Sequence, residues 1–139
     1  MDLLRRENFS SGAPFEDKAG YSRAVRVGNM VFVGGTTSTN SEGVVEGAGD
    51  AYEQTRITLQ KIEDALTQAG ARLADVVRVR MYVTDINRGQ EYLKAYSEWF
   101  KEIRPVITVA EVSALARPDH LIEIEAEAVI GSYTISRLT

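Results

Sequence analysis

A strict alternation of apolar and acidic residues near the end of the chain constrains the fold more than any other feature. From Ile122 to Ile130, apolar residues alternate with Glu123, Glu125 and Glu127. Successive side chains of a β-strand point to opposite faces of a sheet, so this pattern predicts a strand with one apolar and one acidic face. A sheet built around this strand has its core on one side, and its acidic side needs a different explanation.

Four further segments have the composition of strands. Residues 22–27 and 30–35 flank a Gly-Asn pair that tolerates positive φ, which predicts a β-hairpin. Residues 76–83 and 106–112 are rich in β-branched side chains. The expected faces of the first of these two are Val79, Met81 and Val83 on one side, and Arg78, Arg80 and Tyr82 on the other.

Two helices are predicted between the strands. Asp50 offers an N-cap oxygen and Glu53 follows three residues later, which is the spacing of a capping box. Apolar residues then recur at helical spacing as far as Gly70, a residue type that suits the position just after a helix. A second helix is expected after Asn87 and runs to about Lys101, before an Arg-Pro pair that stops it.

The resulting order, β-β-α-β-α-β-β, predicts a single α+β domain over residues 1–139, with residues 1–18 as an extended N-terminal segment. Two helices can cover only one face of the sheet. The segment 30–33 is nevertheless apolar on both sides, as in strands with both faces buried. We therefore expect copies of the chain to cover the helix-free face in a closed homo-oligomer.

Composition excludes several kinds of chemistry. The chain has no cysteine, which rules out thiolate nucleophiles and cysteine zinc sites. His120 is the only histidine, so paired-histidine ribonuclease chemistry and histidine-rich metal sites are excluded as well. We expect His120 to be a surface-loop residue after the preceding turn. No phosphate-binding loop or dinucleotide motif follows a strand, so no cofactor is expected.

Charge and hydropathy indicate the setting of the protein. The formal net charge is −4, which gives no electrostatic reason to bind nucleic acid. The first residues carry charges where a signal peptide needs an apolar stretch, and no later run has the length of a membrane span. These features favour a soluble, cytoplasmic protein with no membrane partner.

The acidic face of the last strand supplies the main candidates for chemistry. Carboxylates placed in such a row either pair with arginines or have raised pKa values that suit acid or base catalysis. For Glu125 and Glu127 we expect ion pairs with Arg78 and Arg80, across strands or across subunits. Glu123 is left open to either role.

Two other positions have simpler interpretations when taken alone. Gly34 and Gly35 end the second strand of the hairpin, where glycine permits close approach of a ligand to the backbone but more often marks a bulge or strand exit. Tyr21 stands just before the first strand, and a lone tyrosine is more often part of a core or rim than a catalyst.

Several motifs together resemble the RidA/YjgF family, formerly described as endoribonuclease L-PSP or translation inhibitor. They are AGYSRA at 19–24, GNMVFVGG at 28–35, the Arg-Pro pair at 104–105 and LIEIEA at 121–126. The similarity runs in the same order from about Gly20 to Ile130. It implies a chorismate-mutase-like fold, a homotrimer and a ligand cleft at each subunit interface. Members of the family hydrolyse enamines and imines such as 2-aminoacrylate to 2-keto acids and ammonia, without metal or cofactor.

The resemblance assigns roles to individual residues. Tyr21 and Glu123 match the cleft tyrosine and the water-positioning glutamate, which makes them the catalytic candidates, and Gly35 matches a glycine that lines the cleft. Thr108 occupies a small hydroxyl position of the family's Pro-Ala-Arg-Ser/Thr segment. Ile107 stands where that segment has the arginine that grips the substrate carboxylate.

Leu93 also departs from the family, because it replaces a cleft residue that is usually asparagine. These departures indicate a branch without the arginine and a more apolar pocket. Arg78, Arg80 or Arg117 are alternative sources of a carboxylate anchor. Three functions follow in decreasing order: hydrolysis of a less charged imine or enamine, non-catalytic binding of a small metabolite in a regulatory trimer, and an endoribonuclease.

Overall fold

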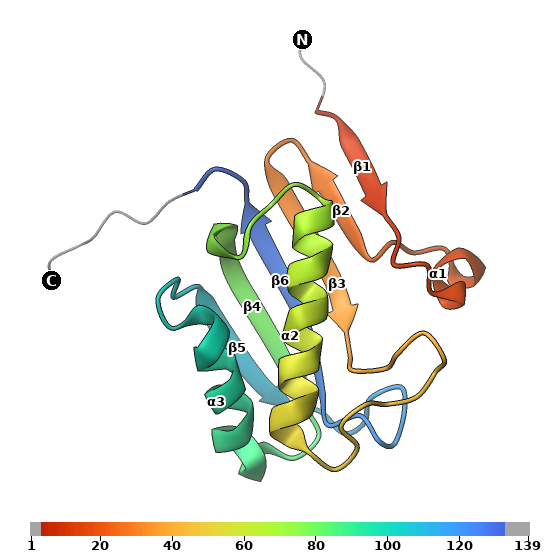
Figure 1. The fold of residues 1–139 in the computed structure, drawn as a ribbon, viewed down its shortest axis with the longest axis vertical. Helices are drawn as coiled ribbons and strands as arrows, with labels where there is room; N and C mark the ends of the chain where they lie inside the picture. The colour runs from red at the N-terminus through yellow and green to blue at the C-terminus, as the bar shows by residue number, and fades with distance from the viewer. Residues whose placement is uncertain (1–3, 133–139) are drawn as a thin grey trace, which may run out of the picture.

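The computed structural model describes residues 4–132, which form a mixed six-stranded sheet with two long helices on one face (Figure 1). The strands lie in the order β1-β2-β3-β6-β4-β5, and only β4 and β5 are parallel neighbours. The strands are β1 (Arg6–Phe9), β2 (Ala24–Val27), β3 (Met30–Thr36), β4 (Val76–Val83), β5 (Val106–Glu111) and β6 (Ile122–Val129). The helices are α1 (Pro14–Ala19), α2 (Ala51–Gln68) and α3 (Gly89–Phe100), with short 3-10 turns η1 (Leu73–Asp75) and η2 (Ile86–Arg88).

The predicted hairpin and alternating strands are confirmed. β2 and β3 pair in antiparallel register through a turn in which Gly28 has a φ of +58°. β4 and β6 bury every second apolar side chain, while their charged side chains lie on the opposite face. The two strands also pair with each other, although 38 residues separate Val83 from Ile122 in the chain. The central sheet is therefore the one the alternation predicts.

Helix α2 begins and ends as its sequence signals indicate, with one difference. The Asp50 carboxylate accepts a hydrogen bond from the Glu53 N–H at 3.0 Å. The Glu53 side chain binds Arg56 instead of returning to the Asp50 backbone, so only half of the predicted capping box forms. At the other end Gly70 has a φ of +89°, and the N–H groups of Gly70 and Ala71 bind carbonyls of the last turn.

The core lies between the sheet and the pair of helices α2 and α3 (Figure 1). Alternation on the strands and the 3.6-residue period of the helices bring their apolar faces together. The largest apolar side chains that are almost fully buried are Leu59, Ile62 and Leu66 of α2, Tyr92 and Phe100 of α3, and Val31, Val79, Met81, Ile122 and Ile124 of the strands.

The face of the sheet without helices carries the predicted ion pairs. Arg80 contacts Glu127 at 3.0 Å and Glu125 at 3.3 Å, and Arg78 contacts Glu127 at 3.6 Å. These cross-strand pairs confirm the structural interpretation of Glu125 and Glu127. Pairs this exposed contribute little to stability individually, but they hold the charges of the two strands in register.

The N-terminal segment differs from the expectation. Where an extended 1–18 was predicted, β1 adds an edge strand to β2 and α1 forms a short helix. Pro14 begins α1 and Gly20, with a φ of +87°, follows it, which is the usual asymmetry of helix ends. Within residues 4–132, no helix is both long and apolar enough to cross a membrane.

The packing of α2 on the sheet makes a direct prediction. Replacing Ile62, which is 1% exposed, with alanine should lower the free energy of unfolding by about 2–5 kcal/mol, since a cavity adds to the lost transfer energy. Gln60→Ala on the exposed side of the same helix is the control and should change stability by about 0.5 kcal/mol at most. Urea unfolding followed by circular dichroism measures both, and equal effects would contradict the assignment of the core.

Candidate functional site

The Glu123 carboxylate lies against the backbone of Gly35, where β3 separates from regular pairing with β6. The register of these strands shifts between Val33 and Thr36, in the part of β3 that contains the two glycines. A Cβ built on Gly35 would stand 2.6 Å from Glu123 Oε2, too close for any real side chain. Because Gly35 has no side chain, the Glu123 carboxylate of β6 can occupy the space beside its Cα. The irregular pairing of β3 at this point places Gly35 next to that carboxylate.

Arg23, just before β2, joins Glu123 and Gly35 in the same place. Its Nη1 donates to the Gly35 carbonyl oxygen and, at 3.1 Å, to the Thr36 hydroxyl. Its guanidinium carbon is also 6.0 Å from the centre of the Tyr21 ring, the geometry of a cation–π contact. Tyr21, Gly35 and Glu123, which were predicted as site residues, are thus brought together around an arginine to which the sequence assigned no role.

The surroundings of Glu123 change its acidity. Burial raises the pKa of Glu123 above the ordinary value, the nearby Arg23 cation lowers it, and the neighbouring Glu125 carboxylate raises it again, with an increase as the result. Glu123 therefore holds its proton to a higher pH than an exposed glutamate does. A carboxyl group whose pKa lies closer to neutrality suits proton transfer to and from a reacting molecule.

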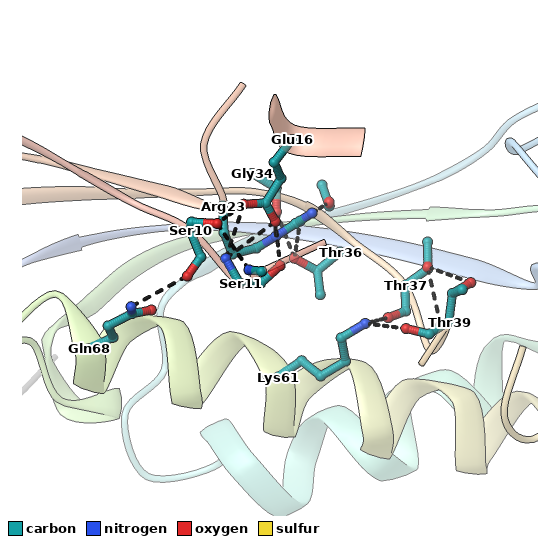
Figure 2. A network of polar contacts seen from close by, with 12 residues as sticks. Ser10, Ser11, Glu16, Arg23, Gly34, Thr36, Thr37, Thr39, Lys61 and Gln68 are labelled. Atoms are coloured by element: carbon teal, nitrogen blue, oxygen red, sulfur yellow. Dashed lines mark hydrogen bonds and ion pairs between the residues drawn. The ribbon is translucent and has the colours of Figure 1, made fainter. Parts of the chain in front are cut away.

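Glu16 of α1 lies next to Arg23 and is 2% exposed (Figure 2). It accepts hydrogen bonds from the Ser10 hydroxyl at 2.8 Å and from both the N–H and the hydroxyl of Ser11. Its Oε2 is 3.7 Å from Arg23 Nε. Burial alone would raise the pKa of Glu16, but these hydrogen bonds and the Arg23 cation lower it. The sequence interpretation missed Glu16 because it treated the segment around it as extended.

His120 is buried, at 4% exposure, and the expectation of a surface-loop residue was wrong. Its Nε2 lies 2.6 Å from the Thr39 hydroxyl, so it ties the loop after β3 to the start of β6. Lys61 of α2 holds the same loop by donating to the carbonyls of Thr37 and Thr39 (Figure 2). Burial, then the Arg117 and Lys61 cations, lower the pKa of His120 and so disfavour its charged form, while Asp119 opposes them. Its position makes His120 a structural residue.

Ile107 lies at a distance from Glu123 within one chain. It pairs with Val79 on β4, and Val79 pairs with Ala126, three residues along β6 from Glu123. With about 3.3 Å per residue and about 4.8 Å between strands, the two backbones are roughly 14 Å apart. Paired residues share a face, so Ile107 is on the helix side of the sheet, whereas Glu123 is on the other.

Thr108 and Leu93 also belong to the distant edge of the molecule. Thr108 follows Ile107 on β5, the outermost strand, and pairs with Arg80. Leu93 projects from α3 and is 46% exposed. The six predicted site residues therefore form two groups within one chain: Tyr21, Gly35 and Glu123 around β3 and β6, and Ile107, Thr108 and Leu93 on β5 and α3.

The three alternative arginines bind other parts of the protein. Arg78 and Arg80 pair with glutamates on the helix-free face, and Arg117 donates to the Gly43 carbonyl at 2.7 Å. Among residues 4–132, no three histidine, aspartate or glutamate side chains are close enough to hold a metal ion. The chemical groups placed together are the Glu123 carboxyl, the Gly35 backbone, the Arg23 guanidinium and the Tyr21 ring that Arg23 contacts.

Comparison of the sequence with known proteins identifies the family to which the chain belongs. The model of the endoribonuclease L-PSP family matches residues 12–130. A RutC family protein of Pyrococcus abyssi is 42% identical over 108 residues, which cover 78% of this chain and 84% of that protein. The 3-aminoacrylate deaminase RutC of Acinetobacter baylyi is 34% identical over 110 residues, 79% of this chain and 86% of the relative.

A solved structure agrees with these matches. Rv2704 of Mycobacterium tuberculosis, described as a member of the YjgF/YER057c/UK114 family, superposes with a TM-score of 0.82 and 49% identity, covering 91% of this chain and all of that one. The mixed sheet with helices on one face is the chorismate-mutase-like fold expected from the resemblance. The chain belongs to the endoribonuclease L-PSP family, the RidA/YjgF/YER057c/UK114 proteins.

Proposed function

We propose that this protein is a cofactor-free hydrolase that converts small imines or enamines to carbonyl compounds and ammonia. The observation that carries the proposal is the partly buried Glu123 carboxyl, with its raised pKa, held over Gly35 beside Tyr21 and Arg23. A relative 34% identical to this chain is a 3-aminoacrylate deaminase, an enzyme of the same reaction class.

The chemistry needs one carboxyl group that moves a proton in both directions. The oxygen of water adds to the imine carbon while the Glu123 carboxylate accepts a proton from that water, and the C=N π electrons move to nitrogen. Glu123 then returns the proton to nitrogen and carries the hydroxyl proton of the resulting carbinolamine to the same nitrogen, so that the C–N bond breaks and ammonia leaves as the carbonyl forms. Water and imine are the only reactants, and one ketone and one ammonia are the products. A raised pKa suits both steps.

The cleft is completed by a second copy of the chain in a homotrimer. Met30 and Phe32 on the helix-free face are 48% and 39% exposed, an apolar area that a neighbouring copy would cover. In this proposal a closed ring also brings the edge that carries Ile107, Thr108 and Leu93 of one copy to the part of β3 and β6 that carries Gly35 and Glu123 in the next.

The substrate we propose has no carboxylate. Ile107 supplies no charge, and Arg23, the cation beside Glu123, already contacts Glu16 and the Gly35 carbonyl. An anionic substrate would leave its carboxylate without a partner at a cost of several kcal/mol. A neutral imine next to Ile107 and Leu93 avoids that cost, consistent with a branch of the family that lacks the arginine.

Two other functions have weaker support. The exposed apolar side chains of Ile107 and Leu93 also fit a regulatory trimer that binds a metabolite without converting it. For an endoribonuclease the chain offers little, because its single histidine, His120, is buried against Thr39.

Glu123→Gln should reduce imine hydrolysis by about 10²-fold or more, because the amide can neither take nor return the proton. The wild-type rate should fall as pH drops through the raised pKa of Glu123, since the carboxylate is the reactive form, and this limb should be absent in the variant. Ammonia release from enzymically generated neutral acyclic imines measures both. Glu127→Gln, on the same strand face, is the matched control. Equal rates for wild type and Glu123→Gln would show that Glu123 is not the catalyst, and a wild type with no rate above background would favour the binding trimer.

Ile107→Arg should increase hydrolysis of 2-aminoacrylate at least tenfold, because a planar guanidinium forms two bonds with a carboxylate. Ile107→Gln has a polar side chain without charge and should give no such gain. Coupled pyruvate detection provides the rate. A folded Ile107→Arg protein with no gain would show that Ile107 is not in the substrate cleft.

Gly35→Ala should lower the rate at least tenfold, because its Cβ would collide with the Glu123 carboxylate and turn it away. Gly34→Ala is a close control: a Cβ there comes no nearer than 3.5 Å to the Arg23 carbonyl, an ordinary contact. Rates and melting temperatures of both variants should be compared. If both glycines tolerate alanine equally, the close approach of Gly35 to Glu123 has no catalytic importance.

A further inference from the structure

The buried pair of Glu16 and Arg23 is more elaborate than the anchoring of a six-residue helix requires. Glu16 is held by Ser10 and Ser11 and is almost completely removed from solvent, while the Arg23 side chain is 17% exposed. A buried charge is costly unless it is paired and hydrogen-bonded, and removing one member of such a pair exposes the other to that cost. An apolar contact would fix α1 more simply, so the charges call for a different explanation.

Arg23 is placed to act on Glu123. Its Nη1 binds the Gly35 carbonyl, and the Glu123 carboxylate occupies the space over the Cα of the same residue. The cation and the carboxylate thus share one backbone unit as their common neighbour. Glu16 contacts the same guanidinium at Nε (Figure 2).

We propose that Arg23 is a positioning residue for Glu123, and that buried Glu16 limits how strongly the Arg23 cation stabilises the Glu123 carboxylate. The catalytic importance of this pair rests on the proposed function, but its electrostatic effect does not. Without Arg23, Glu123 would lose its stabilising cation. Without Glu16, the same cation would act on Glu123 with nothing to offset it.

The other charged and titratable groups near Glu123 do not substitute for this pair. Glu125 on β6 is a like charge and opposes ionisation of Glu123. Tyr82, opposite Glu123 on β4, donates its hydroxyl to Glu125. Arg80 is bound to Glu125 and Glu127. Arg23 is therefore the one cation identified, among the described residues, as favouring the charged form of Glu123.

The test is the titration of the Glu123 carboxyl by carbon-detected NMR in substrate-free protein. Arg23→Gln should raise its pKa and Glu16→Gln should lower it, because one change removes the cation and the other removes the anion that offsets it. Arg26→Gln is the matched control: Arg26, on β2, also binds backbone carbonyls, at Gly28 and Ala69, and should leave Glu123 unchanged.

Two further variants separate charge from folding. Arg23→Lys keeps the charge and should titrate closer to wild type than Arg23→Gln does. If Glu16→Gln folds poorly, Ser10→Ala is the substitute, because it weakens the support of Glu16 without removing a charge. It should shift the pKa of Glu123 less than Glu16→Gln does. Shifts of Arg23→Gln and Glu16→Gln in the same direction, or no shift in either, would overturn the proposal, since a merely structural pair predicts that pattern.

The result is distinguishable from failure of the proposed function. Opposite shifts in a protein that hydrolyses no imine would retain the positioning pair and reject the deaminase. An active enzyme in which Glu123 titrates identically in all variants would retain the deaminase and reject the positioning pair. In an active enzyme, the acid limb of the pH–rate profile should move in the same two directions as the NMR titration.

Discussion

The antiparallel pairing of β3 and β6 at the centre of the sheet is the contact on which the rest depends. These strands come from distant parts of the chain, and their register places Thr36 beside Ile124. The irregularity just before Thr36 puts Gly35 under Glu123 instead of in the ladder. A shift of one residue would turn every glutamate of β6 into the core, so burial of the apolar face strongly fixes this register. The register of β3 and β6 thus determines both the burial of the core and the geometry of the candidate site.

The helix-free face shows how one strand serves two purposes. Toward the start of β4, Arg78 and Arg80 bind Glu127 and Glu125, and their charges are satisfied within the chain. The contacts of Arg80 are with Glu125 and Glu127. The pKa of Glu123 is instead affected by burial and by the Arg23 cation. The three glutamates therefore have different surroundings despite their equal spacing, because Arg78 and Arg80 stand opposite Glu127 and Glu125 on β4 whereas Tyr82 stands opposite Glu123.

Much of the fold was predictable, since alternation and helix signals report local burial directly. β4 has the predicted bounds, and β6 ends one residue early. The N-terminal helix was also signalled, by Pro14 and Gly20 six residues apart, but six residues are too few for a visible apolar period. His120 could not be assigned, because its partner Thr39 lies 81 residues away in the chain. Gly35 lies across the predicted hairpin from Arg23, but the nearness of Arg23 to Glu123 of β6 and to Glu16 of the unpredicted helix α1 comes only from tertiary contacts.

The location of positive charge links the two halves of the proposed cleft. A family member with arginine at the position of Ile107 would bring a cation to the substrate from one copy, whereas here Arg23 stays beside Glu123 on the other. In this proposal Glu16 already binds Arg23, so the Arg23 cation influences Glu123 but is not free to hold an anionic substrate. The same charge cannot fully serve both roles at once. The proposed preference for a neutral substrate and the proposed control of the Glu123 proton therefore rest on a single arrangement of three side chains.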